Sequence, residues 1–281
     1  MGFEFLLDPA GFGLSEGWLR IVADSPYWQV LLAGLLNTLK VALPALVLCS
    51  LLGLLLGFGQ LAAHPLLRRV CQGYVAVFRN IPLLLQLLAA YFAITQFLPI
   101  ASQAWSFQGV LFLSKSGLAM PAFDFASAQW VLPVVGRFSV EGGWVLSPEY
   151  LAVLLALVVY TAAFVAEVVR AGVLAVRPGM RQGALALGLN TRQTNRHIVL
   201  PLALRVMVPS LSNQYLNLLK NASLGVAVGY PELVSVANTA INQSGKAVEC
   251  VLIILFTYAL LSAVAAGLMN LLNRRVNRGA L

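Results

Sequence analysis

Long apolar stretches alternate with short polar segments along the chain, and this pattern predicts membrane-spanning helices. A helix that crosses the hydrocarbon core of a bilayer needs about 20 predominantly apolar residues. The stretches that meet this length cover residues 31–59, 75–98, 150–171, 202–228 and 248–272. The pattern therefore predicts an all-α integral membrane protein with about five transmembrane helices.

The segments between these spans suggest how the chain is organised. Residues 1–29 mix glycine, proline and acidic residues, and we expect an external or interfacial segment there. Residues 30–272 form the expected membrane domain, with a more polar insertion at 101–148 between the second and third spans. Residues 273–281 form a basic tail. The first 24 residues lack the pattern of a cleavable signal, so we expect the spans themselves to direct insertion.

A basic segment at 173–201 separates two strongly apolar regions, and its residues predict two short helices. Pro178 suits the first position of a helix, because its missing N–H needs no partner there. Gly188 is suited to end that helix, and Thr191 to cap a second one. Spacing of i, i+4 and i+7 places three residues on one face of the first helix: Met180, Ala184 and Leu187. Several arginines keep the segment out of lipid, so we predict a compact helical element at the membrane surface.

Composition agrees with a lipid environment and adds an orientation. Of the 281 residues, 60% are hydrophobic and 10% are charged, whereas a soluble domain carries roughly 25% charged residues. Twelve of the 18 Lys and Arg residues fall on the side that holds the basic segment and the C-terminus, and nine of the ten acids fall on the other side. Basic loops stay in the cytoplasm. We therefore interpret the net charge of +8 as a topology signal and not as a nucleic-acid-binding surface.

The residue inventory offers little catalytic chemistry. The fragment Gly245-Lys246-Ala247 lacks the upstream glycine and the Ser or Thr of a phosphate loop, so we do not expect this chain to hydrolyse ATP. His64 and His197 have no carboxylate or cysteine at catalytic or metal-ligand spacing. The three cysteines lie far apart, in or beside apolar runs, and are expected to be buried apolar side chains. We predict no catalytic residue and no metal site.

Within the basic segment, the order of residues resembles the EAA loop of ABC-importer permease subunits. Gln182-Gly183-Ala184 is followed after three residues by Gly188, and after nine more by Ile198-Val199-Leu200-Pro201. All the positions of the family motif are present at the family's spacing. Gln182 stands where the family usually has Glu, and Gly183 where it usually has Ala.

Other motifs resemble the polar amino-acid branch of the same family. They lie in the expected order in the first and second spans, before the basic segment and in the fourth span: GLLNTLK at 34–40, FRNIPL at 78–83, AEVVRAG at 166–172 and LLKNASL at 218–224. The N-terminal sequence FEFLLDPAGF and the long insertion resemble the general L-amino-acid permeases of Gram-negative bacteria. The matches cover most of residues 30–272 and little of 101–148.

The resemblance implies a type I ABC importer permease fold in a bacterial inner membrane. The charge distribution adds the orientation, with a periplasmic N-terminus and a cytoplasmic C-terminus. The implied partners are two ABC ATPase subunits that hold ATP and Mg²⁺, a second homologous permease, a periplasmic amino-acid-binding protein and the amino-acid substrate. No cofactor is expected in this chain. The residues that the resemblance assigns to ATPase coupling are Gln182, Gly183, Ala184, Leu187, Gly188, Ile198, Leu200 and Pro201. The alternative for this segment is an amphipathic element that rests on lipid headgroups.

Polar residues inside the predicted spans are the candidates for the substrate path, since polar groups in lipid usually face a partner or a cavity. They are Arg79, Gln86, Tyr91, Tyr160, Thr161, Glu167, Asn213, Asn217 and Lys220, the last three on one face of a helix. Lys220 or Arg79 would attract a substrate carboxylate, and Glu167 an ammonium group. Two alternatives stay open: Glu167 forms an ion pair with Arg170, and the two asparagines link neighbouring helices.

The sequence therefore predicts a non-catalytic transport subunit. The alternative is a stand-alone secondary transporter or channel for small polar solutes, but the five spans show no inverted repeat. A membrane enzyme is disfavoured by the scarcity of titratable residues on the basic side.

Overall fold

The computed structural model describes residues 2–124, 129–136 and 140–278. Its residue contacts divide it into two compact units, described separately here. Unit 1 comprises residues 1–42, 82–157 and 222–251, and unit 2 comprises residues 43–81, 158–221 and 252–281. Arg137 and the last three residues of the predicted basic tail lie outside the described residues.

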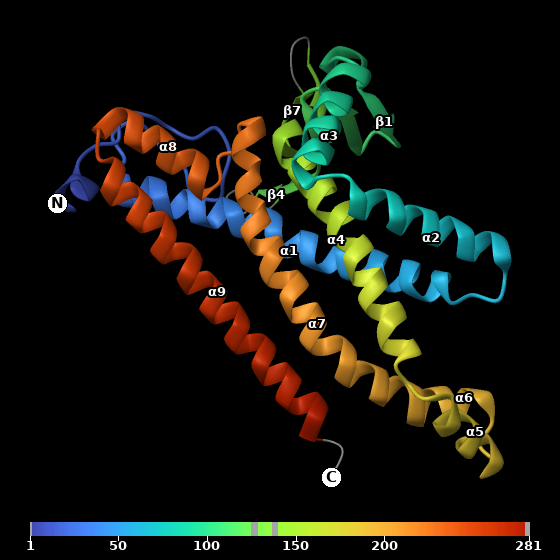
Figure 1. The fold of residues 1–281 in the computed structure, drawn as a ribbon. Helices are drawn as coiled ribbons and strands as arrows, with labels where there is room; N and C mark the ends of the chain where they lie inside the picture. The colour runs from blue at the N-terminus through green and yellow to red at the C-terminus, as the bar shows by residue number, and fades with distance from the viewer. Residues whose placement is uncertain (1, 125–128, 137–139, 279–281) are drawn as a thin grey trace. The chain divides into compact units, whose positions relative to one another are not determined.

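Three helices in the described residues are long and apolar enough to cross a membrane (Figure 1). They are α1 (Tyr27–Gln60), α4 (Pro148–Leu174) and α9 (Ala247–Arg278). The first, third and fifth predicted spans are thereby confirmed as helices. Two broken helix pairs also pass the length and hydropathy test, which gives up to five spans if each pair counts as one.

The predicted second span is not one continuous helix. Helix α2 (Pro65–Asn80) ends before α3 (Leu83–Phe97) begins, and Ile81 between them is extended, with φ −91° and ψ 128°. The cause is Pro82, which lacks an N–H and disfavours helical geometry in the residue before it. The apolar run of 75–98 therefore comprises the end of one helix and all of another.

The predicted fourth span is also broken. Helix α7 (Leu200–Asn221) continues into a 3₁₀ segment, η4 (Ala222–Val228), and the chain then turns into α8 (Leu233–Ser244). Gly229 has a positive φ of 80°, which glycine adopts without steric cost. The Glu232 carboxylate accepts hydrogen bonds of 2.8 Å from the N–H groups of Val234 and Ser235, and so caps α8. Helix α8 was not predicted.

The insertion at 101–148, whose structure the sequence pattern left open, contains short antiparallel strands. A four-stranded sheet has the order β1-β2-β3-β8, and two further pairs are β4-β5 and β6-β7. The strands described are β1 (Trp105–Phe107), β2 (Leu111–Ser114), β3 (Gly117–Met120), β4 (Ala122–Asp124), β5 (Gln129–Val131), β6 (Val134–Val135), β7 (Val140–Glu141) and β8 (Trp144–Leu146). Near the N-terminus and at the start of the insertion, unit 1 also contains the 3₁₀ turns η1 (Glu4–Leu7) and η2 (Ala101–Gln103).

A buried ion pair joins the N-terminal segment of unit 1 to α1. The Lys40 Nζ lies 2.7 Å from Glu16 Oε1, and the two side chains are 4% and 12% exposed. Ser147 donates a hydrogen bond to the other oxygen of Glu16. The ammonium group also lies over the rings of Trp144 and Tyr150, 5.7 and 5.1 Å from their centroids. The charge of Lys40 is thus compensated on several sides, as a buried ammonium requires.

Asn37 and Thr38, which precede Lys40 in the GLLNTLK motif, make hydrogen bonds to the turn that comes before α8. The side-chain amide of Asn37, which is fully buried, donates to the backbone carbonyl oxygens of Glu16 and Pro231, and the backbone carbonyl of Asn37 accepts from the Tyr230 hydroxyl. Thr38 Oγ1 accepts a hydrogen bond of 3.2 Å from the N–H of Leu233. The GLLNTLK motif therefore fixes α1 to the turn that leads into α8.

In unit 2, α1 and α4 approach closely at two glycines. A Cβ atom on Gly53 would lie 2.5 Å from Val165 Cβ, and one on Gly57 would lie 2.6 Å from Val169 Cβ. Real side chains do not fit at these distances, so the absence of a Cβ is what permits this contact. The small-residue pair in the first span has α4 as its packing partner.

Candidate functional site

The basic segment folds into a helical element that closely follows the prediction. Helix α5 (Pro178–Ala186) begins with Pro178, and Gly188 ends it with a φ of +85°. Helix α6 (Thr191–Thr194) is capped by Asn190 and not by Thr191. Asn190 Oδ1 accepts from the Gln193 N–H while Gln193 Oε1 accepts from the Asn190 N–H, which forms a reciprocal capping box. We call residues 177–201 the coupling segment, after the role that the resemblance implies for them.

A five-residue π-helical turn, η3 (Asn195–Val199), joins α6 to α7. Pro201 lies two residues after the end of this turn, and a proline cannot donate an α-helical hydrogen bond. Single π-turns within helices occur frequently at functional sites. In Figure 1, α5 and α6 lie side by side where α4 ends and α7 begins.

A hydrophobic core in unit 2 attaches the coupling segment to α4 and α7. Val176, directly before the segment, and Val199, near its other end, pack with Val169, Ala203 and Met207, all of them buried. Gly172 on α4 lies against the Met207 side chain, with no space for a Cβ. A movement of the coupling segment would therefore displace the ends of both helices.

The exposed surface of the coupling segment differs from the predicted face. Ala184 is buried, whereas Met180 and Leu187 are 48% and 85% exposed. Leu187 follows the last residue of α5, so it does not continue the helical face. Leu185, which is also exposed, was not predicted. Of the remaining residues assigned to coupling, Ile198 is half-buried and five are exposed: Gln182, Gly183, Gly188, Leu200 and Pro201.

A polar cavity of about 280 Å³ lies between α4 and α7 in unit 2. Its lining residues are Tyr160, Thr161, Phe164, Gln214, Asn217, Leu218 and Asn221. The structure thus brings together Tyr160, Thr161 and Asn217, which were predicted for the substrate path. Gln214 and Asn221 were not candidates, although they lie three and four residues from Asn217 and so share its side of the helix.

Beside this cavity, Glu167 lies between two arginines. Arg170 Nη2 is 2.7 Å from Glu167 Oε1, and Arg79 Nη1 is 4.0 Å from Oε2. The predicted alternative of an ion pair with Arg170 is therefore present in the structure. The Arg79 guanidinium also stacks over the ring of Phe164, 5.2 Å from its centroid, and Phe164 lines the cavity. This cluster of two arginines and one carboxylate leaves one positive charge in excess.

The other path candidates lie outside this group. Asn213 and Lys220 are exposed on α7 and do not line this cavity. Gln86 and Tyr91 belong to α3 in unit 1, where the Tyr91 hydroxyl donates to Glu149 at 3.3 Å.

The cysteines are buried and free: Cys49, Cys71 and Cys250. This confirms their interpretation as apolar core residues. No group of three or more His, Cys, Asp or Glu side chains that could hold a metal occurs within the described residues.

These features define a multi-span helical membrane protein with a helical segment anchored to the ends of two of its helices. The chain belongs to the family of inner-membrane components of binding-protein-dependent transport systems, whose sequence pattern matches residues 49–278. It is 36% identical to a putative amino-acid ABC transporter permease protein, YhdX, from Escherichia coli strain K12, over 98% of this chain and 85% of that protein. It is 34% identical to the general L-amino acid transport system permease protein AapQ from Rhizobium johnstonii, over 98% and 83%.

Solved structures share the fold. A crystal structure of an amino acid ABC transporter with histidines matches with a TM-score of 0.66 and 24% identity, covering 89% of this chain and 95% of that one. An inward-facing structure of the MetNI methionine ABC transporter matches with a TM-score of 0.59 and 20% identity, covering 88% and 96%. The predicted type I ABC importer permease fold is confirmed.

Proposed function

We propose that this chain is the permease subunit of an ATP-driven ABC importer for amino acids. It works with a second homologous permease, two cytoplasmic ATPase subunits that bind ATP and Mg²⁺, and a periplasmic amino-acid-binding protein. The chain itself performs no catalysis. The observation that carries the proposal is the coupling segment, because its core contacts would transmit a push from an ATPase directly to α4 and α7.

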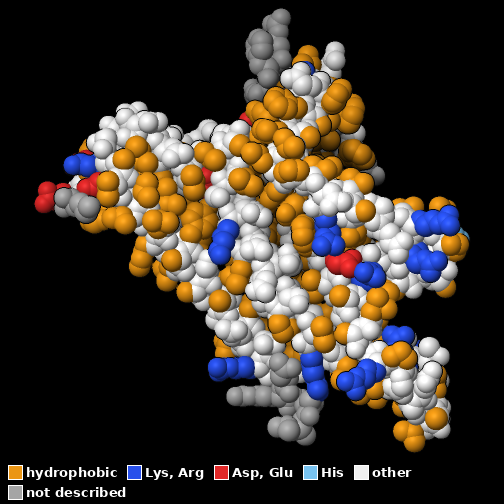
Figure 2. Space-filling model, in the orientation of Figure 1, with side chains coloured by type: hydrophobic (Ala, Val, Ile, Leu, Met, Phe, Trp, Pro, Cys, Tyr) orange, Lys and Arg blue, Asp and Glu red, His pale blue; other side chains and the backbone are white. Residues whose placement is uncertain are grey.

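The docking surface on the ATPase side would consist of exposed apolar residues next to basic ones. Met180, Leu185 and Leu187 supply the apolar part. Figure 2 shows Lys and Arg side chains over α5 and α6 and over the beginning of α2. This distribution of charge supports a cytoplasmic location for the coupling segment.

The substrate class follows from the relatives and from the polar cavity. Two relatives that align over nearly the whole chain are named as amino-acid permeases. The cavity offers hydroxyl and amide groups that can bind a polar solute by hydrogen bonds, and the nearby excess positive charge suits a carboxylate. We assign Tyr160, Thr161 and Asn217 to the substrate path, with Arg79 attracting the carboxylate.

Replacing Gly188 by leucine is expected to lower ATP-driven uptake at least about tenfold, because a left-handed conformation costs a branched side chain about 1–2 kcal/mol and the turn between α5 and α6 would rearrange. The measurement is amino-acid uptake and ATP hydrolysis by the reconstituted complex. ATP hydrolysis should lose its stimulation by the loaded binding protein.

The matched control is Gly179→Ala, in α5 of the same segment and not among the residues assigned to coupling. A Cβ there meets no atom within 4 Å, and alanine should strengthen α5 by about 0.5–1 kcal/mol. We expect uptake to be maintained. If Gly188→Leu also transported normally, the coupling role would have to be abandoned.

Replacing Asn217 by alanine is expected to raise the KM for uptake about 2- to 10-fold, which corresponds to one lost hydrogen bond. The measurement is the substrate dependence of uptake by the same complex. The control, Ser212→Ala, lies on the same helix and removes a hydroxyl that bonds within the helix to Val208, so its KM should not change. If Asn217→Ala and Ser212→Ala had the same KM, Asn217 would not contact the substrate.

A further inference from the structure

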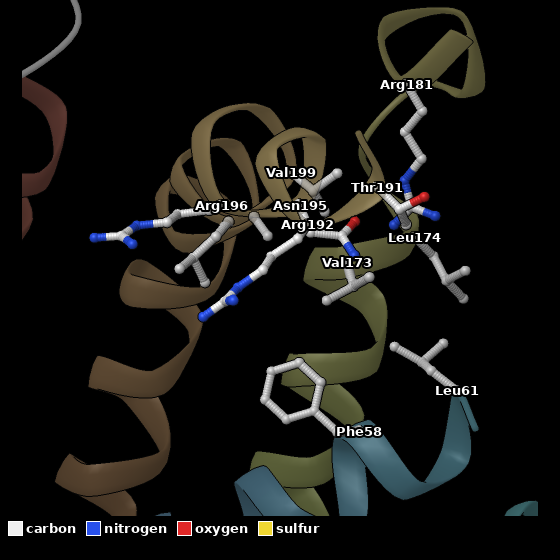
Figure 3. A pocket seen from close by; sticks show the side chains of 12 residues that line it. Phe58, Leu61, Val173, Leu174, Arg181, Thr191, Arg192, Asn195, Arg196 and Val199 are labelled. Carbon is white, nitrogen blue, oxygen red and sulfur yellow. The ribbon is translucent and has the colours of Figure 1, made fainter. Parts of the chain in front are cut away.

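A large cavity in unit 2 is formed where the coupling segment meets the ends of two membrane helices. Its volume is about 1010 Å³. Phe58 contributes from the end of α1, Leu61 from the residue after it and Leu174 from the end of α4. Arg181, Arg192 and Arg196 contribute from the coupling segment. Figure 3 shows the apolar side chains below and the α6 residues above them. The cavity thus has an apolar floor and a basic rim.

The basic rim is strongly cationic. In Figure 3, Arg192 extends toward the side where Phe58 lies, Arg181 extends toward Thr191, and Arg196 points away from both. The sequence of unit 2 contains thirteen Lys and Arg residues and a single acid, Glu167. That acid is engaged by Arg79 and Arg170. Within unit 2, therefore, no further acid is present to balance the charge of the rim, and an anion from outside this unit would be attracted to it.

The apolar floor continues into a second hollow. This hollow has a volume of about 440 Å³ and lies between α1 and α2, with Leu55, Leu67 and Cys71 among its lining residues. Phe58 lines both spaces, so they adjoin at its ring. A free phosphate would use the rim alone, whereas a ligand with an anionic head and a long apolar tail would use the rim and both hollows.

We propose that this site binds an anionic phospholipid, with its phosphate on Arg181 and Arg192 and an acyl chain passing over Phe58 into the apolar hollow. Basic pockets between membrane helices on the cytoplasmic side are suited to phospholipid headgroups. The bound lipid fills the space between the coupling segment and the ends of α1 and α4. The site requires no ATPase, so it is tested on the isolated chain.

The first test measures retention of phosphatidylglycerol and phosphatidylcholine by the purified chain, using native mass spectrometry. We expect preferential retention of phosphatidylglycerol, and about 30-fold weaker retention in an Arg181→Ala, Arg192→Ala double variant. The control double variant, Arg68→Ala with Arg69→Ala, removes the same charge from exposed positions on α2 and should retain the lipid. Equal loss in both variants, or no preference for the anionic lipid, would overturn the proposal.

The second test separates a lipid from a free anion and needs no substitution. Phosphatidylglycerol with a photoreactive group on its acyl chain should cross-link to peptides that contain Phe58 or Leu61. Excess inorganic phosphate or glycerol phosphate should not abolish this cross-link. Displacement of the lipid by either anion at equal concentration would show a phosphate site only. If the double variant kept the lipid but lost assembly with the ATPase, the arginines would serve the protein partner and the lipid site would be refuted.

Discussion

Replacing Lys40 by methionine is expected to lower the free energy of unfolding by about 3–5 kcal/mol, because it leaves the Glu16 carboxylate buried without its counter-charge. Glu16 is held by Lys40 and Ser147, and its carbonyl oxygen accepts from Asn37, so the loss also loosens the N-terminal segment. The measurement is the unfolding of the purified chain in detergent, followed by circular dichroism.

A double-mutant cycle isolates the ion pair from other effects of the substitution. Combining Lys40→Met with Glu16→Leu should recover most of the loss, because no uncompensated charge remains. The control, Lys246→Met, removes an exposed ammonium from the same unit and should change stability by no more than about 0.5 kcal/mol. If the double variant were as unstable as the sum of the single variants, the pair would not be coupled.

Replacing Gly57 by leucine is expected to cost about 3 kcal/mol of stability or more, since the added side chain must push α1 away from α4. Its Cβ would lie 2.6 Å from Val169 Cβ and 2.9 Å from the carbonyl oxygen of Ala166. The backbone oxygen cannot move aside as the end of a flexible side chain would. The midpoint of thermal unfolding in detergent provides the measurement.

Gly267 on α9 offers the matched comparison. It also lies in an apolar helix, but a Cβ there meets no atom within 4 Å. Gly267→Leu should therefore leave the midpoint unchanged or raise it slightly, because leucine favours a helix more than glycine does. A similar loss of stability in both variants would contradict the close approach of α1 and α4.

The long helices could be predicted from hydropathy because α1, α4 and α9 are continuous apolar runs. The broken pairs could not, because a hydropathy window averages across a break of a few residues. Ile81-Pro82 did contain the relevant signal, since proline rarely continues a helix. The strands of the insertion have two to four residues, too short for a period-2 pattern to stand out.

The start of α5, its end at Gly188 and the start of α6 were predicted to within one residue, because these signals depend on local chemistry, whereas the π-helical turn was not predicted. Asn190 and Thr191 are both good capping residues, and only the geometry distinguishes them. The partner of Lys40 could not be predicted. Glu16 is 24 positions away, and several other acids were assigned to the same side of the membrane. The fold selects among them by bringing the N-terminal segment against α1.

The most direct test of the proposed function is amino-acid uptake by proteoliposomes that contain this chain, its second permease and the ATPase, with the binding protein added outside. The proposal predicts that uptake requires ATP on the ATPase side, the loaded binding protein and an intact coupling segment. Uptake by vesicles that contain this chain alone, without ATP, would contradict it and would support a stand-alone transporter.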